Sequence, residues 1–336
     1  MQHLLHQECA RRIEPVRMPS HAEIERVFRK RQRMLWGLCY RLTGVAADAD
    51  ELVQETFVRA MERPPTVRDE EWHRWLVRVA TNLSLDRLRA RRRRSYVGPW
   101  LPAPIEISEL DGAGEGVDAG YERMESVSYA FLLALEALGP RARAVLLLRE
   151  VFDYSAAEVA GLLDTSEANV RVVHHRARRR LDAASPELRP LREVAGPTRV
   201  ALQALLDCLM RQDDAGMRAL LTASVRTVTD AGGEYTALRE PLVGLDRVVR
   251  FHLEVGRRRG PISRVEMREL NGLPALVIET TPLRPQMAPR LVLRCEVDRT
   301  GRITELHTIL TARKLTAVRF SRGDSSARPS SHQSGA

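Results

Sequence analysis

The stretch that decides the fold of the middle of the chain is Ser155-Ala-Ala-Glu-Val-Ala-Gly-Leu-Leu-Asp-Thr-Ser-Glu167. Ser155 and Glu158 have the spacing of a capping box, so a short helix is expected to begin there and run to Leu163. A three-residue turn follows, and Glu167 begins a second helix that we expect to reach Leu181. Two short helices joined by a tight turn indicate a helix-turn-helix, whose second helix enters the major groove of DNA.

The second helix of this pair has one apolar face and one basic face. Val170, Val173 and Ala177 lie on the face that would pack against the first helix. The remaining side chains suit base and phosphate contacts, because Arg can form two hydrogen bonds with guanine. The exposed set is Arg171, Val172, His175, Arg176, Arg178 and Arg179. The alternative is a solvated basic face on a structural helix, which the tight turn makes the weaker interpretation.

Upstream, residues 21–94 have helical periodicity throughout. In 48–61 the apolar positions form one stripe, and the opposite face carries Asp50, Glu51, Gln54 and Glu55. Pro64-Pro65 ends that helix, and a third helix containing Trp72 and Trp75 runs into a segment, 87–94, in which six of eight residues are Arg.

The third helix has two interpretations. Its arginines fit contacts with a nucleic-acid backbone, although a charge run in a linker is the commoner case. Trp72 and Trp75 could stack on an unpaired base, with Asn82 and Asp86 supplying hydrogen bonds. Tryptophans at helical spacing are more often core residues, and for these two we favour the core.

Downstream, the character of the sequence changes twice. Residues 96–125 begin with Tyr96-Val-Gly-Pro-Trp-Leu-Pro-Ala-Pro104, become acidic and Gly-rich, and are interpreted as a linker. Beyond Gly196-Pro197 the patterns become mixed, with a two-residue hairpin signal at Asn271-Gly272. Helices are expected at 198–211, 214–222 and 244–258, and strands at 262–270, 273–280, 290–297 and 303–311. The fold class is therefore two all-α regions followed by an α+β domain.

Length and charge limit the number of domains and the class of partner. A chain of 336 residues is long enough for two to three domains, and 53 basic against 44 acidic residues favour a polyanionic partner. Four cysteines lie far apart without zinc-ligand spacing, so neither a metal site nor a disulfide framework is expected. No run of about 18 apolar residues occurs, so we expect no membrane partner and a cytoplasmic location.

Three segments in sequence order resemble domain two of the extracytoplasmic-function (ECF) sigma factors of bacterial RNA polymerase, in the sigma-70 family. They are Leu35-Trp-Gly-Leu-Cys-Tyr-Arg-Leu-Thr-Gly44, Asp48-Ala-Asp-Glu-Leu-Val-Gln-Glu-Thr-Phe-Val-Arg59 and Trp75-Leu-Val-Arg-Val-Ala-Thr-Asn-Leu-Ser-Leu-Asp-Arg-Leu-Arg89. The helix-turn-helix resembles their domain four. The segment 96–104 is similar to the linker of the subgroup with a fused C-terminal SnoaL-like domain, the type of mycobacterial sigma factor J.

The resemblance implies a domain plan and site residues. The plan is an extension (1–20), domain two (21–95), a linker (96–125), domain four (126–190), a SnoaL-like domain (196–315) and a disordered tail (316–336). Residues facing the polymerase β′ clamp helices would be Asp48, Asp50, Glu51 and Gln54. Those near the minus-ten strand would be Asn82, Asp86, Arg87 and Arg91. Those at the minus-thirty-five element would be Arg171, Val172, His175, Arg176 and Arg178. Regulatory residues would be Trp100, Pro102, Asp230, Gly232, Gly233, Lys314 and Leu315.

Two motifs of the subgroup are altered here. The stretch Asp230-Ala-Gly-Gly-Glu234 stands where Asp-Gly-Gly-Gly-Lys is usual, and Thr311-Ala-Arg-Lys-Leu315 stands where Asn-Pro-Asp-Lys-Leu is usual. Val172 replaces a residue that is often polar, which favours an apolar contact such as a thymine methyl. The family's mode of regulation is therefore carried over to this chain less directly than its promoter recognition.

The resemblance implies a transcription initiation factor that is not an enzyme and needs no cofactor. Its partners would be promoter DNA and core RNA polymerase, through the β′ clamp helices and the β flap, without a separate anti-sigma factor. A small-molecule ligand of the C-terminal domain stays open, and so does catalysis there. The dispersed acids and bases are Asp230, Asp246, His252, Glu279 and His307. The competing class is a helix-turn-helix regulator that never contacts polymerase, with a ligand-sensing or enzymatic C-terminal domain. It leaves the segments 48–59 and 75–89 without a role.

Overall fold

The computed structural model describes residues 20–63, 69–93, 96–106, 128–184 and 190–318. The expected N-terminal extension (all but Ser20), the acidic part of the linker and the expected tail beyond Val318 lie outside these residues. No helix in the described ranges is long and apolar enough to cross a membrane.

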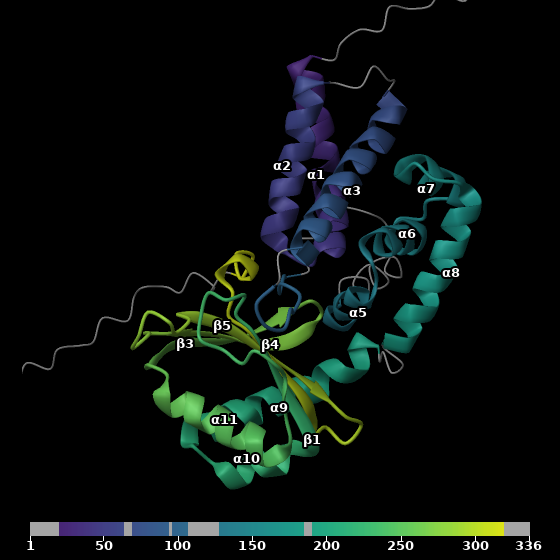
Figure 1. Cartoon of the computed structure of the whole chain (residues 1–336). Coiled ribbons are helices and arrows are strands. Elements are labelled where there is room, and N and C mark those ends of the chain that lie inside the picture. The colour runs from purple at the N-terminus through teal and green to yellow at the C-terminus, as the bar shows by residue number, and fades with distance from the viewer. Residues whose placement is uncertain (1–19, 64–68, 94–95, 107–127, 185–189, 319–336) are drawn as a thin grey trace, which may run out of the picture.

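Three long helices form the first group: α1 (His21–Thr43), α2 (Ala46–Glu62) and α3 (Asp69–Arg93) (Figure 1). Helix α1 begins at a capping box between Ser20 and Glu23. It ends at Gly44, whose φ of 70° is the left-handed conformation that glycine adopts without strain. Trp72 of α3 is only 5% exposed and belongs to the core, so the interpretation as a core residue is correct.

The second group contains α5 (Tyr129–Ala134), the 3-10 turn η2 (Leu135–Ala137), α6 (Pro140–Glu150), α7 (Ala156–Leu163) and α8 (Glu167–Ala184). Both side-chain bonds of the predicted capping box form at the start of α7. Asp164 takes a left-handed conformation that turns the chain into α8. Val170 and Ala177 of α8 are buried, as the apolar face of the second helix predicted.

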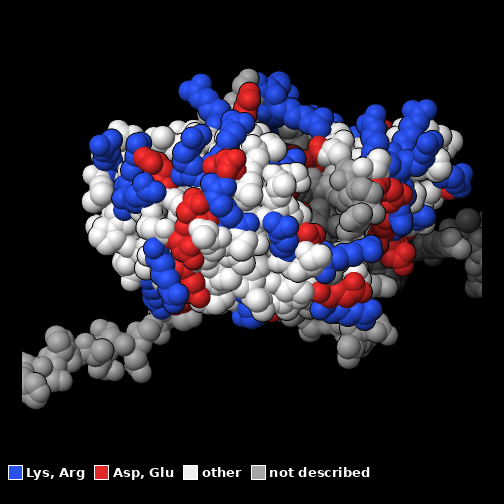
Figure 2. All heavy atoms as spheres, turned by 90° about the horizontal axis from the view of Figure 1, so that it is seen from below, with Lys and Arg blue, Asp and Glu red and all other residues white. Residues whose placement is uncertain are grey.

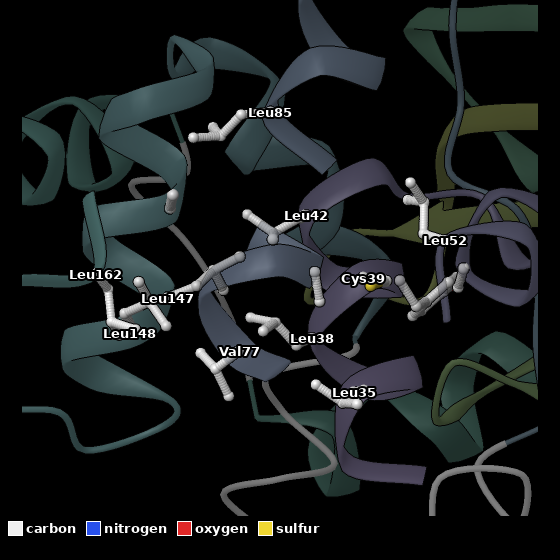
Figure 3. Packing of buried hydrophobic residues seen from close by; sticks show 14 of the residues in the cluster. Leu35, Leu38, Cys39, Leu42, Leu52, Val77, Leu85, Leu147, Leu148 and Leu162 are labelled. Atoms are coloured by element: carbon white, nitrogen blue, oxygen red, sulfur yellow. The ribbon is translucent and has the colours of Figure 1, made fainter. Parts of the chain in front are cut away.

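Both helical groups share one hydrophobic core (Figure 3). Leu38 and Leu42 of α1 and Leu147 and Leu148 of α6 belong to the same buried cluster. The fully buried guanidinium of Arg143 donates to the carbonyl oxygen of Leu42 at 2.8 Å, across the boundary between the groups. Since a buried charge is costly without partners, this bond favours one fixed arrangement of the two groups.

The C-terminal half is a six-stranded sheet with helices on one face. The strand order is β2-β1-β6-β5-β4-β3, and β1 pairs parallel with β6 whereas the other neighbours are antiparallel. The strands are β1 (Leu221–Asp230), β2 (Leu242–Val243), β3 (Ile262–Leu270), β4 (Leu273–Thr280), β5 (Arg290–Val297) and β6 (Ile303–Ile309). The last four follow the prediction closely, while β1 and β2 were not predicted.

The helices of this half are α9 (Leu191–Arg211), α10 (Asp214–Leu220) and α11 (Leu245–Arg258), and η3 (Ala312–Lys314) follows β6. The predicted start of a helix at 198 is wrong, because α9 continues through Gly196-Pro197. The φ of proline suits a helix, but proline lacks one backbone N–H donor. Pro197 lies on an exposed face of α9, and the helix continues through it. The predicted helix at 214–222 ends at Leu220, where β1 begins.

The two faces of the sheet have different neighbours (Figure 1). Helices α9, α10 and α11 cover one face, and the two helical groups lie on the other side. Residues of α9 and α11 line a cavity together with Thr229, Ile278 and Leu293 of the sheet. Leu101 from the linker, Tyr129 from α5 and Leu315 and Val318 from the C-terminal segment pack in one cluster with residues of the second face. The linker is therefore a structural layer between the sheet and the sigma-like helices.

The face of the molecule seen from the side of the C-terminal half carries mixed charge. Figure 2 shows Lys and Arg side chains interspersed with Asp and Glu around uncharged surface, without one continuous basic area on this face.

Candidate polymerase-binding face and promoter-reading helices

The acidic face, which we define as Asp48, Asp50, Glu51 and Gln54 of α2, lies near the base of the first helical group. Asp50, Glu51 and Gln54 are exposed, but Asp48 as a whole residue is only 8% exposed. Arg87 of α3 donates to Asp48 at 2.7 Å and to Glu51 at 2.9 Å. One residue that was expected at the minus-ten strand thus binds two residues that were expected at the polymerase.

A second arginine reaches the same carboxylates from the other end of the chain. Arg313 of η3 donates to Asp48 at 2.7 Å and to Glu51 at 2.6 Å. Although partial burial acts to raise the pKa of Glu51, its bonds with Arg87 and Arg313 hold that pKa below its ordinary value. Figure 1 shows the yellow C-terminal segment beside the lower end of α2. The C-terminal domain therefore covers part of the acidic face.

Asp230, at the end of β1, connects the C-terminal domain to the linker. Its carboxylate accepts hydrogen bonds from the Tyr96 hydroxyl at 2.5 Å and from the Leu101 backbone N–H at 2.7 Å. Lys314 donates to Asp230 at 2.5 Å and to the Leu101 carbonyl oxygen at 2.6 Å. Burial lowers the pKa of Lys314 to about 8, against the opposing charge of Asp230.

The other regulatory candidates surround this buried pair. Gly232 and Gly233 have φ values of 55° and 83°, and an added Cβ would lie 3.1 Å from the Tyr96 hydroxyl oxygen or 3.3 Å from the Val97 Cβ. Pro102 is buried in the linker, and Leu315 is buried in the cluster beneath it. The structure thus brings the whole predicted regulatory set together around residues 96–102.

The Trp100 ring fills the space at the end of α1. A Cβ at Gly44 would lie 2.5 Å from the ring, so glycine is required there for steric reasons as well as for its φ. The Arg91 guanidinium lies 4.3 Å and the Lys314 ammonium 4.2 Å from the ring centroid, as cation–π contacts.

Sequence reasoning missed Asn271 as a contact residue. It was interpreted only as a turn, but its buried side chain donates to the Tyr40 hydroxyl of α1 at 2.8 Å. Its backbone N–H donates to the Ile105 carbonyl oxygen, also at 2.8 Å. The β3–β4 turn thereby holds the linker and α1 together. Arg313 was likewise missed; its only signal was its position beside Lys314.

Four residues of α3 were expected near the minus-ten strand, and they divide into two pairs. Asn82 and Asp86 are exposed. Arg87 is held by the acidic face, and Arg91 donates to the Thr43 carbonyl oxygen at 3.1 Å and to Glu136 at 2.5 Å. In this arrangement Arg91 joins the two helical groups and is not displayed for DNA.

The recognition helix, α8, exposes the whole predicted set of Arg171, Val172, His175, Arg176 and Arg178. Val172 is 47% exposed, so its methyl groups are accessible to a partner. Arg178 donates to Glu150 of α6 at 2.9 Å, and Arg171 pairs with Glu167 one turn earlier. The basic face of α8 is open to a partner.

The five acids and bases weighed for catalysis do not converge. The C-terminal domain encloses a cavity of about 680 Å³, and of the five only His252 lines it. Asp246 pairs with Arg218, Glu279 with Arg290 and Asp230 with Lys314. His307 packs against Tyr129 on the opposite face of the sheet. Among the described residues, this dispersed set resembles no catalytic constellation.

Comparison with known proteins agrees with this arrangement. Residues 27–94 match the family described as Sigma-70 region 2, and residues 128–181 match Sigma-70, region 4. Over 240 residues, 70% of this chain and 73% of the relative, the sequence is 35% identical to ECF RNA polymerase sigma factor SigJ of Mycobacterium tuberculosis. It is 27% identical over 318 residues, 91% of this chain, to the probable ECF sigma factor SigI of the same species, of which 99% is covered.

The crystal structure of Mycobacterium tuberculosis SigJ superposes with a TM-score of 0.62 and 26% identity, over 88% of this chain and 99% of that one. The predicted fold class, two helical regions followed by an α+β region, is confirmed by this likeness and by the elements above. The chain therefore belongs to the ECF RNA polymerase sigma factors.

Proposed function

We propose that this sigma factor is regulated in cis, and that its C-terminal domain holds it in a closed form that binds core polymerase weakly. The observation that carries the proposal is the position of Arg313 on Asp48 and Glu51. If the acidic face binds the β′ clamp helices, Arg313 and the clamp compete for the same carboxylates.

The closed form has several layers of support. The buried Lys314–Asp230 pair fixes η3, which carries Arg313, against the linker. The linker is itself fixed to α1, because the Tyr40 hydroxyl donates to the Ala103 carbonyl oxygen at 2.6 Å. Opening therefore has to break a chain of contacts in which Arg313 is the most exposed link.

Promoter DNA would be bound by α8 and α3 after opening. The exposed face of α8 supplies base contacts near its start and phosphate contacts from its later arginines. Asn82 and Asp86 lie on the exposed side of α3, where hydrogen-bonding groups could capture an unstacked base. Release of Arg87 and Arg91 from Asp48, Glu51 and Glu136 would add positive charge to that site.

The experiment uses Asp50, which belongs to the acidic face but not to the contact with Arg313. Asp50→Arg should abolish binding to purified core polymerase, both alone and combined with Arg313→Ala. Glu25→Arg is the matched control, because Glu25 is an exposed acid of α1 outside the acidic face. Wild-type affinity of the Asp50→Arg chain would contradict the assignment of this face.

We also propose that no separate anti-sigma factor is required, because η3, the segment that covers the acidic face, belongs to the chain itself. Purified full-length chain and core polymerase, with no other protein, should then reproduce the inhibition that Arg313→Ala relieves. Inhibition that appears only after a cell extract is added would contradict this part of the proposal.

A further inference from the structure

The cavity of the C-terminal domain has an apolar wall and an apolar entrance. Its volume of about 680 Å³ is in the range of sites that hold small organic molecules. Leu206, Phe251 and Leu293 line it. Met210 and Ile262 also line it and are 61% and 37% exposed, so apolar side chains continue from the wall to the surface.

One part of the wall is cationic. Arg259, at the end of α11, lines the cavity, is partly buried, and has no hydrogen bond or ion pair to its guanidinium among the described residues. Burial lowers the pKa of Arg259, without an acidic neighbour to oppose the shift. A partly desolvated guanidinium is ordinarily paired, so this one lacks a counter-ion that the described residues do not supply.

The neighbouring polar group is neutral. His252 is 8% exposed, and its Nε2 lies 3.0 Å from the Thr227 hydroxyl oxygen. Burial and the nearby charge of Arg259 lower the pKa of His252 to about 4, so the ring is uncharged at physiological pH. Arg257 also lines the cavity, but its side chain is exposed and donates to the Gln212 side-chain oxygen at 2.8 Å. Arg259 is consequently the partly buried positive charge that a ligand here would meet close to this histidine.

We propose that this cavity binds an apolar carboxylic acid, with the hydrocarbon body against Leu206, Phe251 and Leu293 and the carboxylate on Arg259. The charge of Arg259 and the apolar wall of the cavity both favour an apolar carboxylic acid as the ligand. A wholly apolar ligand would leave the guanidinium unpaired, and a small inorganic anion would leave most of the apolar wall against water. A planar guanidinium can hold a carboxylate through two parallel hydrogen bonds.

The site is continuous with the regulatory contacts, and this part of the inference rests on the proposed function. Thr229 and Thr308 line the cavity and are paired across β1 and β6. The next residue after Thr229 is Asp230, and β6 leads through Leu310, another lining residue, to Arg313 and Lys314. A ligand that shifts these two strand ends acts on the contacts that hold the closed form.

Calorimetry of the full chain tests the site without polymerase. The probes are biphenyl-4-carboxylate and its neutral isostere, biphenyl-4-carboxamide. We expect one carboxylate per chain, bound at least tenfold more tightly than the amide. Arg259→Gln should remove this preference, Arg259→Lys should keep part of it, and Arg250→Gln, an exposed arginine of α11 outside the cavity, should leave it unchanged. Equal affinity for the two probes, no binding of either, or a preference that survives Arg259→Gln would overturn the site.

The coupling has its own measurement. Saturating biphenyl-4-carboxylate should change the affinity of the full chain for core polymerase at least threefold, and should have no effect on Arg259→Gln. If the probe binds with the expected preference but leaves polymerase affinity unchanged, the coupling is wrong and the site stands. Failure of the proposed function would be recognised separately, from an Arg313→Ala chain that binds polymerase like the wild type.

Discussion

Arg313→Ala removes the contact between the C-terminal domain and the acidic face, and the structure sets its magnitude. The Arg313 side chain is 46% exposed, and the side chains of its two partners, Asp48 and Glu51, are 11% and 47% exposed. An exposed ion pair contributes about 0.2–1 kcal/mol, and the pair with the sheltered Asp48 should be at the upper end. Arg87 stays on both carboxylates after the substitution, so no buried charge is left unpaired. The closed form should therefore lose about 1–2 kcal/mol in total.

This loss has a direct effect on polymerase binding. A change of about 1–2 kcal/mol shifts the equilibrium between closed and open forms by about 5–30-fold. While the closed form predominates, the apparent affinity for core polymerase should rise by the same factor, since only the open form binds. The effect should shrink at high ionic strength, because partly exposed charges are screened.

Fluorescence anisotropy of labelled chain titrated with core polymerase measures this shift. Arg250→Ala is the matched control, as an exposed arginine of α11 that is remote from α2. A circular dichroism spectrum and thermal transition like those of the wild type would show that Arg313→Ala folds. Under those conditions, an unchanged dissociation constant would refute competition for the acidic face.

Three further outcomes are expected. Asp230→Ala leaves the buried Lys314 without its counter-charge, which should destabilise the docked C-terminal domain by about 3–5 kcal/mol and speed proteolysis within residues 96–106; an unchanged cleavage rate would contradict the role of the pair. Arg176→Ala should weaken promoter binding by about 1–3 kcal/mol in a footprinting titration, whereas Arg250→Ala should not; equal footprints would contradict the recognition-helix assignment. Because the folded-state pKa of His252 is lowered to about 4, the unfolded chain binds a proton between the ordinary histidine pKa and pH 4 that the folded domain does not. As the pH is lowered across that window, the free energy of unfolding should fall by up to about 3 kcal/mol. His252→Gln should reduce this fall, measured by urea titrations at a series of pH values. The same dependence of unfolding free energy on pH in both chains would contradict this prediction.

The elements that could be predicted from the sequence are those whose signals are local. The capping box at Ser155 and Glu158 and the two-residue turn at Asn271-Gly272 define their elements within a few residues, and the structure has both. Strand β1 was missed because its burial pattern does not alternate, and because its partner, β6, lies about 80 residues further along the chain. The helical start expected after Pro197 failed because an exposed proline lies within α9 without ending it.

The candidate site was predictable in its members but not in its connections. The motifs around Trp100, Asp230 and Lys314 were recognised by resemblance, and the structure brings them into contact. No local pattern could pair Arg313 with Asp48, since the two are 265 residues apart in the chain. The segment 96–125 was likewise interpreted only as a linker, whereas 101–105 are buried between α1 and the sheet. Contacts of this kind depend on tertiary packing, which no short sequence window contains.

The most direct test of the central claim is the distance between α2 and the C-terminal domain, with and without polymerase. Spin labels at Met61→Cys and Thr316→Cys occupy exposed positions on α2 and on the C-terminal segment. Pulsed electron–electron double resonance measures the distance between the two labels in the free chain and in the complex with core polymerase. The closed form predicts a single short distance in the free chain, and a longer distribution once core polymerase is bound. The same distance distribution in both states would contradict the claim that the C-terminal domain has to leave the acidic face before polymerase can bind.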